Sequence, residues 1–233
     1  MTDLGEGLCL GLVGGLGVGA AVQYYRELAS AHVRRGSPMR LVMIHAEVNR
    51  VLRLAAAKEN DALAEYLAGL ISHLENAGAE IAAIPAVTPH ICEPKLRQIA
   101  SLPLVSPVEE IVREVQLRCL RRVALFGTRF VVESRLFGRL GDLEVVPPRA
   151  MEVDAIHAAY LKIVNVGAGR APVKETLRRI AHRLCEEEGA EAIILAGTEL
   201  SLVFQPGNTD FPCIDGTRLH LDAIMRALFP ATD

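Results

Sequence analysis

The chain has 233 residues, of which 51% are hydrophobic and 23% charged, and its formal net charge at pH 7 is −3. This length and composition allow a substantial core, in one large domain or two small ones. The basic residues are scattered and form no basic stripe that would serve a phosphate backbone, so we expect no nucleic-acid partner.

No apolar run in the sequence approaches the roughly 20 residues that a membrane span needs, so we expect no membrane partner. Acidic Asp3 and Glu6 stand where a signal peptide would carry positive charge, which indicates a cytoplasmic location. The cysteines show no CxxC or Cys/His metal spacing, so we expect reduced, mostly buried thiols and no metal site. They are Cys9, Cys92, Cys119, Cys185 and Cys213.

In chain order, short apolar runs alternate with amphipathic stretches, which is typical of strand–helix units around a parallel sheet. The apolar runs predict strands over residues 8–13, 41–45, 80–86, 102–105, 122–126, 143–146, 190–196 and 212–215. The clearest helical patterns cover residues 60–77, 108–118, 153–164, 173–188 and 218–228. The sequence therefore predicts an α/β protein.

Two segments of the chain repeat each other: GAEIAAIPAVTPH begins at Gly78, and GAEAIILAGTE begins at Gly189. The offset of 111 (189 − 78) also carries Ala86 onto Gly197, and LVGG at 12–15 matches LFGT at 125–128 with an offset of 113 (125 − 12). The repeat predicts two pseudo-symmetric α/β halves, each with about four parallel strands and with a ligand cleft between them. We expect one domain over 1–106 plus 210–233 and the other over 107–209.

Ligands of open α/β sheets bind at the carboxyl ends of the strands. The small and hydroxyl-bearing residues expected there are Gly14, Ala86, Thr88, Gly127, Thr128, Gly197 and Thr198. The turn Gly14–Gly15–Leu16–Gly17 can present backbone N–H groups to a carboxylate at a helix start. His45, Glu47 and Asn49 follow the second strand, so we expect them at the rim of the same site.

Four segments are informative both in themselves and in their order along the chain. They are LGLVGGLGVGAAVQYY from Leu10, LFGTRFVVESRLF from Leu125, LAGTEL from Leu195 and IDGTRLHLDAI from Ile214. With them the chain resembles the aspartate/glutamate racemase family, which also includes hydantoin and allantoin racemases, maleate isomerase and arylmalonate decarboxylase. The resemblance implies a small carboxylate or amino-acid ligand, no cofactor and a homodimer.

Racemases of that family carry one cysteine at each of two strand ends, in Cys-Asn-Thr and Gly-Cys-Thr-Glu segments. One thiolate removes the α-proton of the substrate, and the opposite thiol returns a proton on the other face. The resemblance places these cysteines at Ala86 and Gly197, with Val87 in place of the usual asparagine and Val131 in place of a threonine that binds a substrate carboxylate. Alanine and glycine have no titratable group, so the two-thiol mechanism is excluded here.

Two functions therefore stay open. The first is an altered racemase, isomerase or lyase in which another residue transfers the proton; the candidates are Glu199, His45 and Cys213, together with Thr88 and His90. The second is a pseudoenzyme that binds a metabolite without turning it over. Structural roles compete with these assignments, since Glu199 and His90 can cap helices, Asp215 can cap the last helix and His220 can pack against it.

Overall fold

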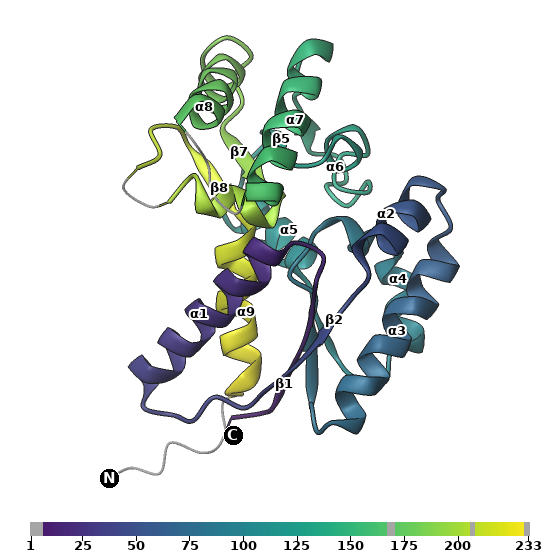
Figure 1. Ribbon diagram of the computed structural model, residues 1–233. Coiled ribbons are helices and arrows are strands. Elements are labelled where there is room, and N and C mark those ends of the chain that lie inside the picture. The colour runs from purple at the N-terminus through teal and green to yellow at the C-terminus, as the bar shows by residue number, and fades with distance from the viewer. Residues whose placement is uncertain (1–6, 167–170, 206–207, 231–233) are drawn as a thin grey trace. The chain divides into compact units, whose positions relative to one another are not determined.

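The computed structural model describes residues 7–166, 171–205 and 208–230. Over these residues the chain forms two four-stranded parallel sheets, with the strand orders β2-β1-β3-β4 and β6-β5-β7-β8 (Figure 1). The predicted α/β class and the two four-stranded parallel sheets are thus confirmed. The chain divides into two compact units, Met1–Ser106 with His220–Asp233 and Pro107–Leu219, and each is described by itself below.

Each of the eight predicted strands is present. They are β1 Leu10–Gly14, β2 Leu41–His45, β3 Ile81–Ala83, β4 Leu104–Val105, β5 Arg122–Phe126, β6 Glu144–Val145, β7 Ala192–Leu195 and β8 Cys213–Asp215. The strand predicted over residues 80–86 ends early, at Ala83. Pro85 follows two residues later and has no N–H group to donate to a strand ladder, which explains the early end.

The helices are α1 Val18–Arg35, α2 Val48–Ala56, α3 Asn60–Asn76, α4 Glu93–Ile99, α5 Pro107–Leu117, α6 Arg129–Glu133, α7 Ala150–Val166, α8 Ala171–Glu186 and α9 Gly216–Leu228. Two short 3₁₀ helices, η1 Thr88–Cys92 and η2 Thr198–Leu202, follow β3 and β7. The five helices predicted from the pattern are confirmed with shifted ends. No helix in the ranges that the structure covers is long and apolar enough to cross a membrane.

The sheet of the first unit is covered on both faces. Side chains alternate along β1, so Leu10 and Leu12 join a core with Leu28 of α1 and Ile224 of α9, whereas Val13 faces the core beneath α2, α3 and α4. Figure 1 shows α1 and α9 side by side on one side of this sheet and α3 and α4 on the other. A strand buried on both faces must be apolar throughout, as the sequence of β1 is.

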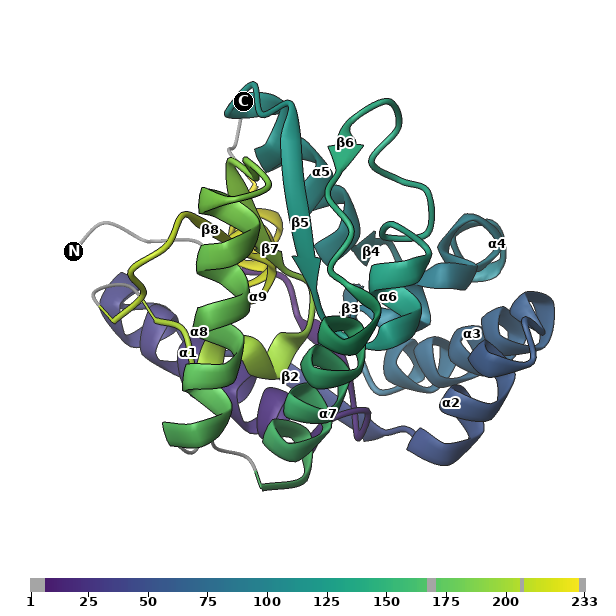
Figure 2. The ribbon, with the colours of Figure 1, turned by 90° about the horizontal axis from the view of Figure 1, so that it is seen from above.

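In the second unit, α7 and α8 lie side by side over one face of the sheet (Figure 2). Ile156 and Ile163 of α7 pack with Leu177 and Ile180 of α8 against Phe126 of β5, and all five are 3% exposed or less. At about 25 cal/mol per Å² of buried apolar surface, side chains of this size each contribute about 1.5–3 kcal/mol when fully buried. This core packs α7 and α8 against the central strands β5 and β7.

The strand pairing repeats between the two units. Leu10 of β1 pairs with Ile81 of β3, and Val123 of β5 pairs with Ala192 of β7. The offsets are 113 (123 − 10) and 111 (192 − 81), the same two that relate the repeated sequences. The repeated motifs therefore occupy equivalent positions in two sheets of equivalent strand order.

The repeated Gly-Ala-Glu has a structural role in both units. Gly78 and Gly189 have φ of 95° and 71°, a left-handed conformation that glycine adopts most readily after a helix. Glu80 accepts a hydrogen bond from the Cys9 N–H at 2.7 Å, and Glu191 accepts one from the Arg122 N–H at 2.9 Å. Each glutamate therefore binds the backbone at the start of the neighbouring central strand.

Candidate functional site

The turn after β1 is shaped by a glycine with positive φ. Gly15 has φ of 87°, and a Cβ atom built on it would lie 2.5 Å from the carbonyl oxygen of Ala46. The Ala46 N–H donates to the Gly14 carbonyl oxygen at 2.9 Å, so the ends of β1 and β2 are held together. Gly17 is extended and precedes α1 as its N-cap residue. The turn therefore needs Gly15 for close packing, whether or not it also binds a ligand.

The end of β2 has polar residues at the surface. Glu47 caps α2, because its carboxylate accepts a hydrogen bond from the Asn49 N–H at 2.9 Å. The Glu47 N–H in turn donates to the Tyr66 hydroxyl at 2.8 Å. The side chains of His45 and Asn49 are exposed beside this cap. Capping thus accounts for Glu47, while His45 and Asn49 stay predictions as ligand contacts.

The segment after β3 holds Ala86, Val87 and His90 in a buried environment. Nδ1 of His90 donates to the carbonyl oxygen of Ala86 at 2.8 Å, since a carbonyl oxygen can only accept. The ring is 2% exposed, and its Nε2 atom has no hydrogen-bond partner among the residues that the structure describes. Burial lowers the pKa of His90, although the nearby Glu93 carboxylate acts to raise it. His90 is therefore a neutral imidazole with a lone pair on Nε2.

The end of β5 carries the predicted Gly127–Thr128 pair. A Cβ atom at Gly127 would lie 2.8 Å from the Ala196 carbonyl oxygen, so only glycine lets β5 and β7 approach this closely here. Thr128 is the N-cap of α6, and its hydroxyl accepts a hydrogen bond from the Val131 N–H at 3.3 Å. The Val131 side chain is fully buried.

The end of β7 is closed by a residue that the sequence did not indicate. Gly197 is extended, with φ of −144° and ψ of 122°, a conformation open to any residue. A Cβ atom there would lie 2.5 Å from Cε2 of Tyr160 and 3.0 Å from its Cδ2 and Cζ atoms. The Tyr160 ring of α7 thus fills the space that a side chain at position 197 would need.

Glu199 is the only carboxylate among the residues predicted to transfer a proton, and it is 1% exposed. Its Oε2 atom accepts hydrogen bonds from the Tyr160 hydroxyl at 2.7 Å and from the Thr198 hydroxyl at 3.0 Å. Burial, and then the charge of Glu199, raise the pKa of Tyr160 well above its usual range. The phenol therefore stays protonated and serves as a hydrogen-bond donor to the carboxylate.

Two polar residues near β8, Asp215 and His220, have structural roles. The Asp215 carboxylate accepts hydrogen bonds from the backbone N–H groups of Thr217 and Arg218 at 2.9 and 3.2 Å, so Asp215 caps α9. His220 is fully buried, and its ring contacts the Tyr24 hydroxyl and the Val105 carbonyl oxygen. Cys213 begins β8, which puts it at the amino end of the strand, and burial raises the pKa of its thiol.

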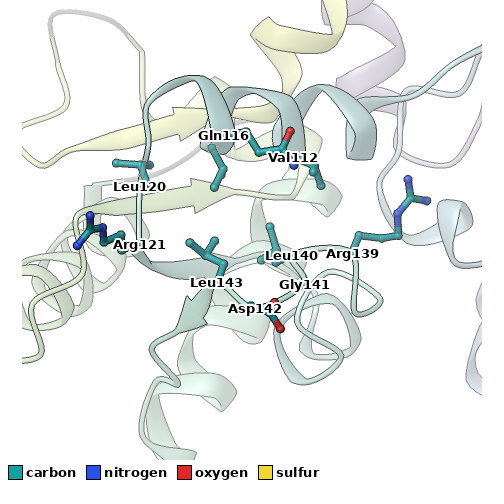
Figure 3. Close-up of a pocket in the computed structure, with 10 residues that line it drawn as sticks. Val112, Gln116, Leu120, Arg121, Arg139, Leu140, Gly141, Asp142 and Leu143 are labelled. Carbon is teal, nitrogen blue, oxygen red and sulfur yellow. The ribbon is translucent and has the colours of Figure 1, made fainter.

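A depression of about 440 Å³ lies at the end of the second sheet opposite to the carboxyl ends of its strands (Figure 3). Leu120 and Arg121 precede β5, and Leu143 precedes β6, so the depression is at the amino ends of these strands. Figure 3 shows Arg121 and Arg139 at its two ends. None of the residues predicted to bind the ligand lines it. Within the described ranges, no group of three or more His, Cys, Asp or Glu side chains could hold a metal ion.

Comparisons with known proteins support the resemblance seen in the sequence. A family described as Asp/Glu/Hydantoin racemase matches residues 13–224. The fold is similar to that of a Yersinia pestis protein assigned to the Asp/Glu racemases, with a TM-score of 0.78 and 23% identity over 95% of this chain and 99% of that chain. It is also similar to an aspartate racemase homologue from Pyrococcus horikoshii, with a TM-score of 0.77 and 24% identity over 94% of this chain and 98% of that chain. A glutamate racemase from Francisella tularensis, in complex with D-glutamate, gives a TM-score of 0.66 and 14% identity over 96% of this chain and 81% of that chain.

Proposed function

Because the chain belongs to the Asp/Glu/Hydantoin racemase family, we propose that it binds a small carboxylate or amino acid at the carboxyl ends of its strands, without two-thiol racemisation. The binding groups would be the strand-end residues Gly14, Gly15, Leu16, Gly17, Asn49, Ala86, Val87, Thr88, Thr128, Val131, Gly197, Thr198 and Glu199. The D-glutamate complex of the Francisella tularensis glutamate racemase supports this class of ligand.

The observation that carries the proposal is the contact between position 197 and Tyr160. Gly197 has no thiol, and the structure leaves no space for one. The Tyr160 ring lies 2.5 Å from the position that a Cβ atom at residue 197 would occupy. The ring is held there by the hydrogen bond from its hydroxyl to Glu199. A proton donor at position 197 therefore requires a second change, at Tyr160.

The hydrogen bonds from the Tyr160 and Thr198 hydroxyls argue against Glu199 as the base that replaces a thiolate. A general base must reach the proton that it removes and must be able to accept it. The Glu199 Oε2 lone pairs are instead directed at two hydroxyl donors, Tyr160 and Thr198, and the residue is 1% exposed. We infer that Glu199 fixes the Tyr160 ring and the η2 backbone, and that the protein acts as a metabolite-binding member of the family.

An altered racemase or isomerase is the second candidate function, and one observation favours it. The buried His90 imidazole lies four residues after Ala86, and the lone pair of its Nε2 atom has no hydrogen-bond partner among the residues that the structure describes. A single base is sufficient to remove an α-proton and return it to the same face, whereas racemisation needs access to both faces. Solvent exchange without racemisation would therefore be the expected residual activity of such a site.

Ligand binding is tested by thermal unfolding in the presence of aspartate, glutamate and succinate at 10 mM. For a ligand that binds with a Kd of about 0.1 mM, this concentration is about 100 times Kd. Binding at about 100 times Kd stabilises a protein by about 2.7 kcal/mol, which shifts its Tm by several degrees. Thr88→Val should reduce the shift, since it exchanges a hydroxyl for a methyl group of the same size. Thr176→Val is the matched control, because the Thr176 hydroxyl bonds to Pro172 within α8. No shift with any of these compounds would contradict the proposed binding site.

A further inference from the structure

A left-handed turn shapes the chain between α6 and β6. Residues 135–137 have φ of 51°, 55° and 60°, Gly138 follows with 71°, and the Gly138 N–H donates to the Ser134 carbonyl oxygen at 2.9 Å. Left-handed backbone is unfavourable for residues with a side chain and persists where the surrounding structure holds it, here through the fully buried Leu136. The course of the next residues, 139–143, therefore starts from a strained turn that the fold maintains.

Residues 139–143 form one wall of the depression at the amino ends of β5 and β6, and α5 forms the other (Figure 3). The walls are apolar in the middle, with Val112 and Val115 on α5 and Leu140 and Leu143 on the loop. Val112 and Leu143 are half-buried, so part of their apolar surface is open to a ligand. The volume of about 440 Å³ is within the range of small-molecule sites, about 300–1,000 Å³.

The two ends of the depression carry positive charge, from Arg121 and Arg139 (Figure 3). The Arg121 guanidinium makes no hydrogen bond or ion pair with residues in the described ranges, although its charge acts on the Glu191 carboxylate. Nη2 of Arg139 lies 4.0 Å from the Glu109 carboxylate, and an ion pair this long between exposed side chains is weak. Asp142 is the acidic residue among the lining residues in the described part of the chain. Both ends can therefore attract an anion.

The spacing of the two ends follows from the length of α5. Arg139 lies beside Glu109 near the start of this helix, and Arg121 follows its end at Leu117. A helix rises by about 1.5 Å per residue, so Glu109 and Leu117, eight residues apart (117 − 109), are separated by about 12 Å along its axis. A single carboxylate, or a short dicarboxylate such as succinate, is too small to bridge this distance.

We propose that the depression binds an elongated organic anion, which has an acidic group at each end and an unbranched aliphatic chain between them. The chain covers the valines and leucines of the two walls, and the acidic groups pair with Arg121 and Arg139. All the residues of this site belong to the second unit, at the ends of the strands opposite to those in the proposed function. The two sites therefore stand or fall separately.

Methyl NMR of the protein with carbon-13 in its leucine and valine methyl groups tests the proposal. The probes are azelate, nonanoate and nonanediol, which share one chain length and carry two, one and no carboxylates. We expect azelate to shift the Leu140 and Leu143 resonances. Nonanoate should bind about two- to fivefold more weakly, and nonanediol more weakly again by a similar factor, because an exposed ion pair contributes modestly. Succinate should leave these resonances in place.

Two variants test the charges at the site. Arg121→Gln should weaken azelate binding to about the level of nonanoate, and it keeps the backbone N–H that donates to Glu191. Asp142→Asn should tighten azelate binding by about twofold, because it removes a charge of the same sign as the ligand. Arg113→Gln is the matched control, since Arg113 is also an exposed arginine near α5's end but pairs with Glu110 and does not line the depression. It should leave azelate binding unchanged.

Three results would overturn the proposal. Azelate that binds no more tightly than nonanediol, or that binds equally well to Arg121→Gln, would show that the arginines do not hold its ends. Leu140 and Leu143 resonances that stay in place with all three probes at millimolar concentration would show that the depression binds none of them. Shifts confined to Leu16 and Val87 would place azelate at the strand ends of the proposed function instead.

Discussion

Gly197→Ala is the smallest change that tests whether Tyr160 closes the end of β7. The backbone conformation at Gly197 suits alanine, so backbone strain adds no cost, and the loss of freedom in the unfolded chain alone would stabilise the variant by about 0.4–1 kcal/mol. The new methyl carbon would, however, lie 2.5 Å from Cε2 of Tyr160, about 1 Å inside normal contact distance. Overpacking of this kind costs about 1–3 kcal/mol.

Moving the Tyr160 ring away from the new methyl group is costly, because its hydroxyl donates a hydrogen bond to the buried Glu199 carboxylate at 2.7 Å. A hydrogen bond to a charged group is worth about 1.5–3 kcal/mol, which is of the same size as the overlap. We therefore expect Gly197→Ala to lower the free energy of unfolding by about 1–2 kcal/mol, measured by urea denaturation at pH 7.

A double-mutant cycle isolates the cause of this loss. In a Tyr160→Ala background the ring is absent, so Gly197→Ala should be neutral or slightly stabilising, giving a coupling energy of about 1–3 kcal/mol. Gly69→Ala is the matched control, because a Cβ atom at Gly69 meets no atom within 4 Å and the residue lies within α3. It should stabilise the protein by up to about 1 kcal/mol. A coupling energy near zero between positions 160 and 197 would refute the reasoning.

Three further outcomes follow from the buried polar groups and the thiols. Arg97→Met should lower the free energy of unfolding by about 3 kcal/mol in urea denaturation, because it leaves the buried Glu93 carboxylate without its cation. Burial lowers the pKa of His220 to about 3, and a proton on His90 would act in the same direction, so the unfolded chain binds more protons than the folded one below pH 6.5. Stability should therefore fall as the pH drops from about 6.5 toward 3, by up to about 1.4 kcal/mol per pH unit for this group, and a urea midpoint that is flat between pH 7 and 5 would contradict the assignment. Mass spectrometry after brief alkylation at pH 8 should find the exposed Cys119 modified and Cys92 intact, because burial raises the pKa of the Cys92 thiol to about 12.

The fold could be predicted from the sequence because each of the eight strands follows the same local pattern. Apolar runs of strand length separated by amphipathic stretches predict a parallel sheet, and the repeat from Gly78 to Gly189 predicts two of them. The left-handed turn at Arg135, Leu136 and Phe137 could not be predicted, since φ of 51°, 55° and 60° is unfavourable by about 1–2 kcal/mol for each such residue. Tertiary packing decides such a segment, and no local preference indicates it.

The site was less predictable than the fold, because its decisive contacts join residues far apart in the chain. Glycine at position 197 can be read from the sequence, but its contact with Tyr160 depends on how α7 packs over the sheet. The burial of His90 Nε2, without a hydrogen-bond partner in the described part of the chain, likewise becomes visible only in the folded structure. The shared role of Glu80 and Glu191 also became visible only in the structure, although the repeat had placed the two residues at equivalent positions.

The central claim is that this member of the family does not racemise its ligand by the two-thiol route. Proton NMR of L- and D-aspartate and L- and D-glutamate in deuterated water, incubated with the unaltered protein, tests it most directly. We expect the α-proton signals to persist unchanged over many hours, because neither Ala86 nor Gly197 can carry a proton. Steady loss of the α-proton signal together with interconversion of the enantiomers, absent from a boiled sample, would contradict the claim.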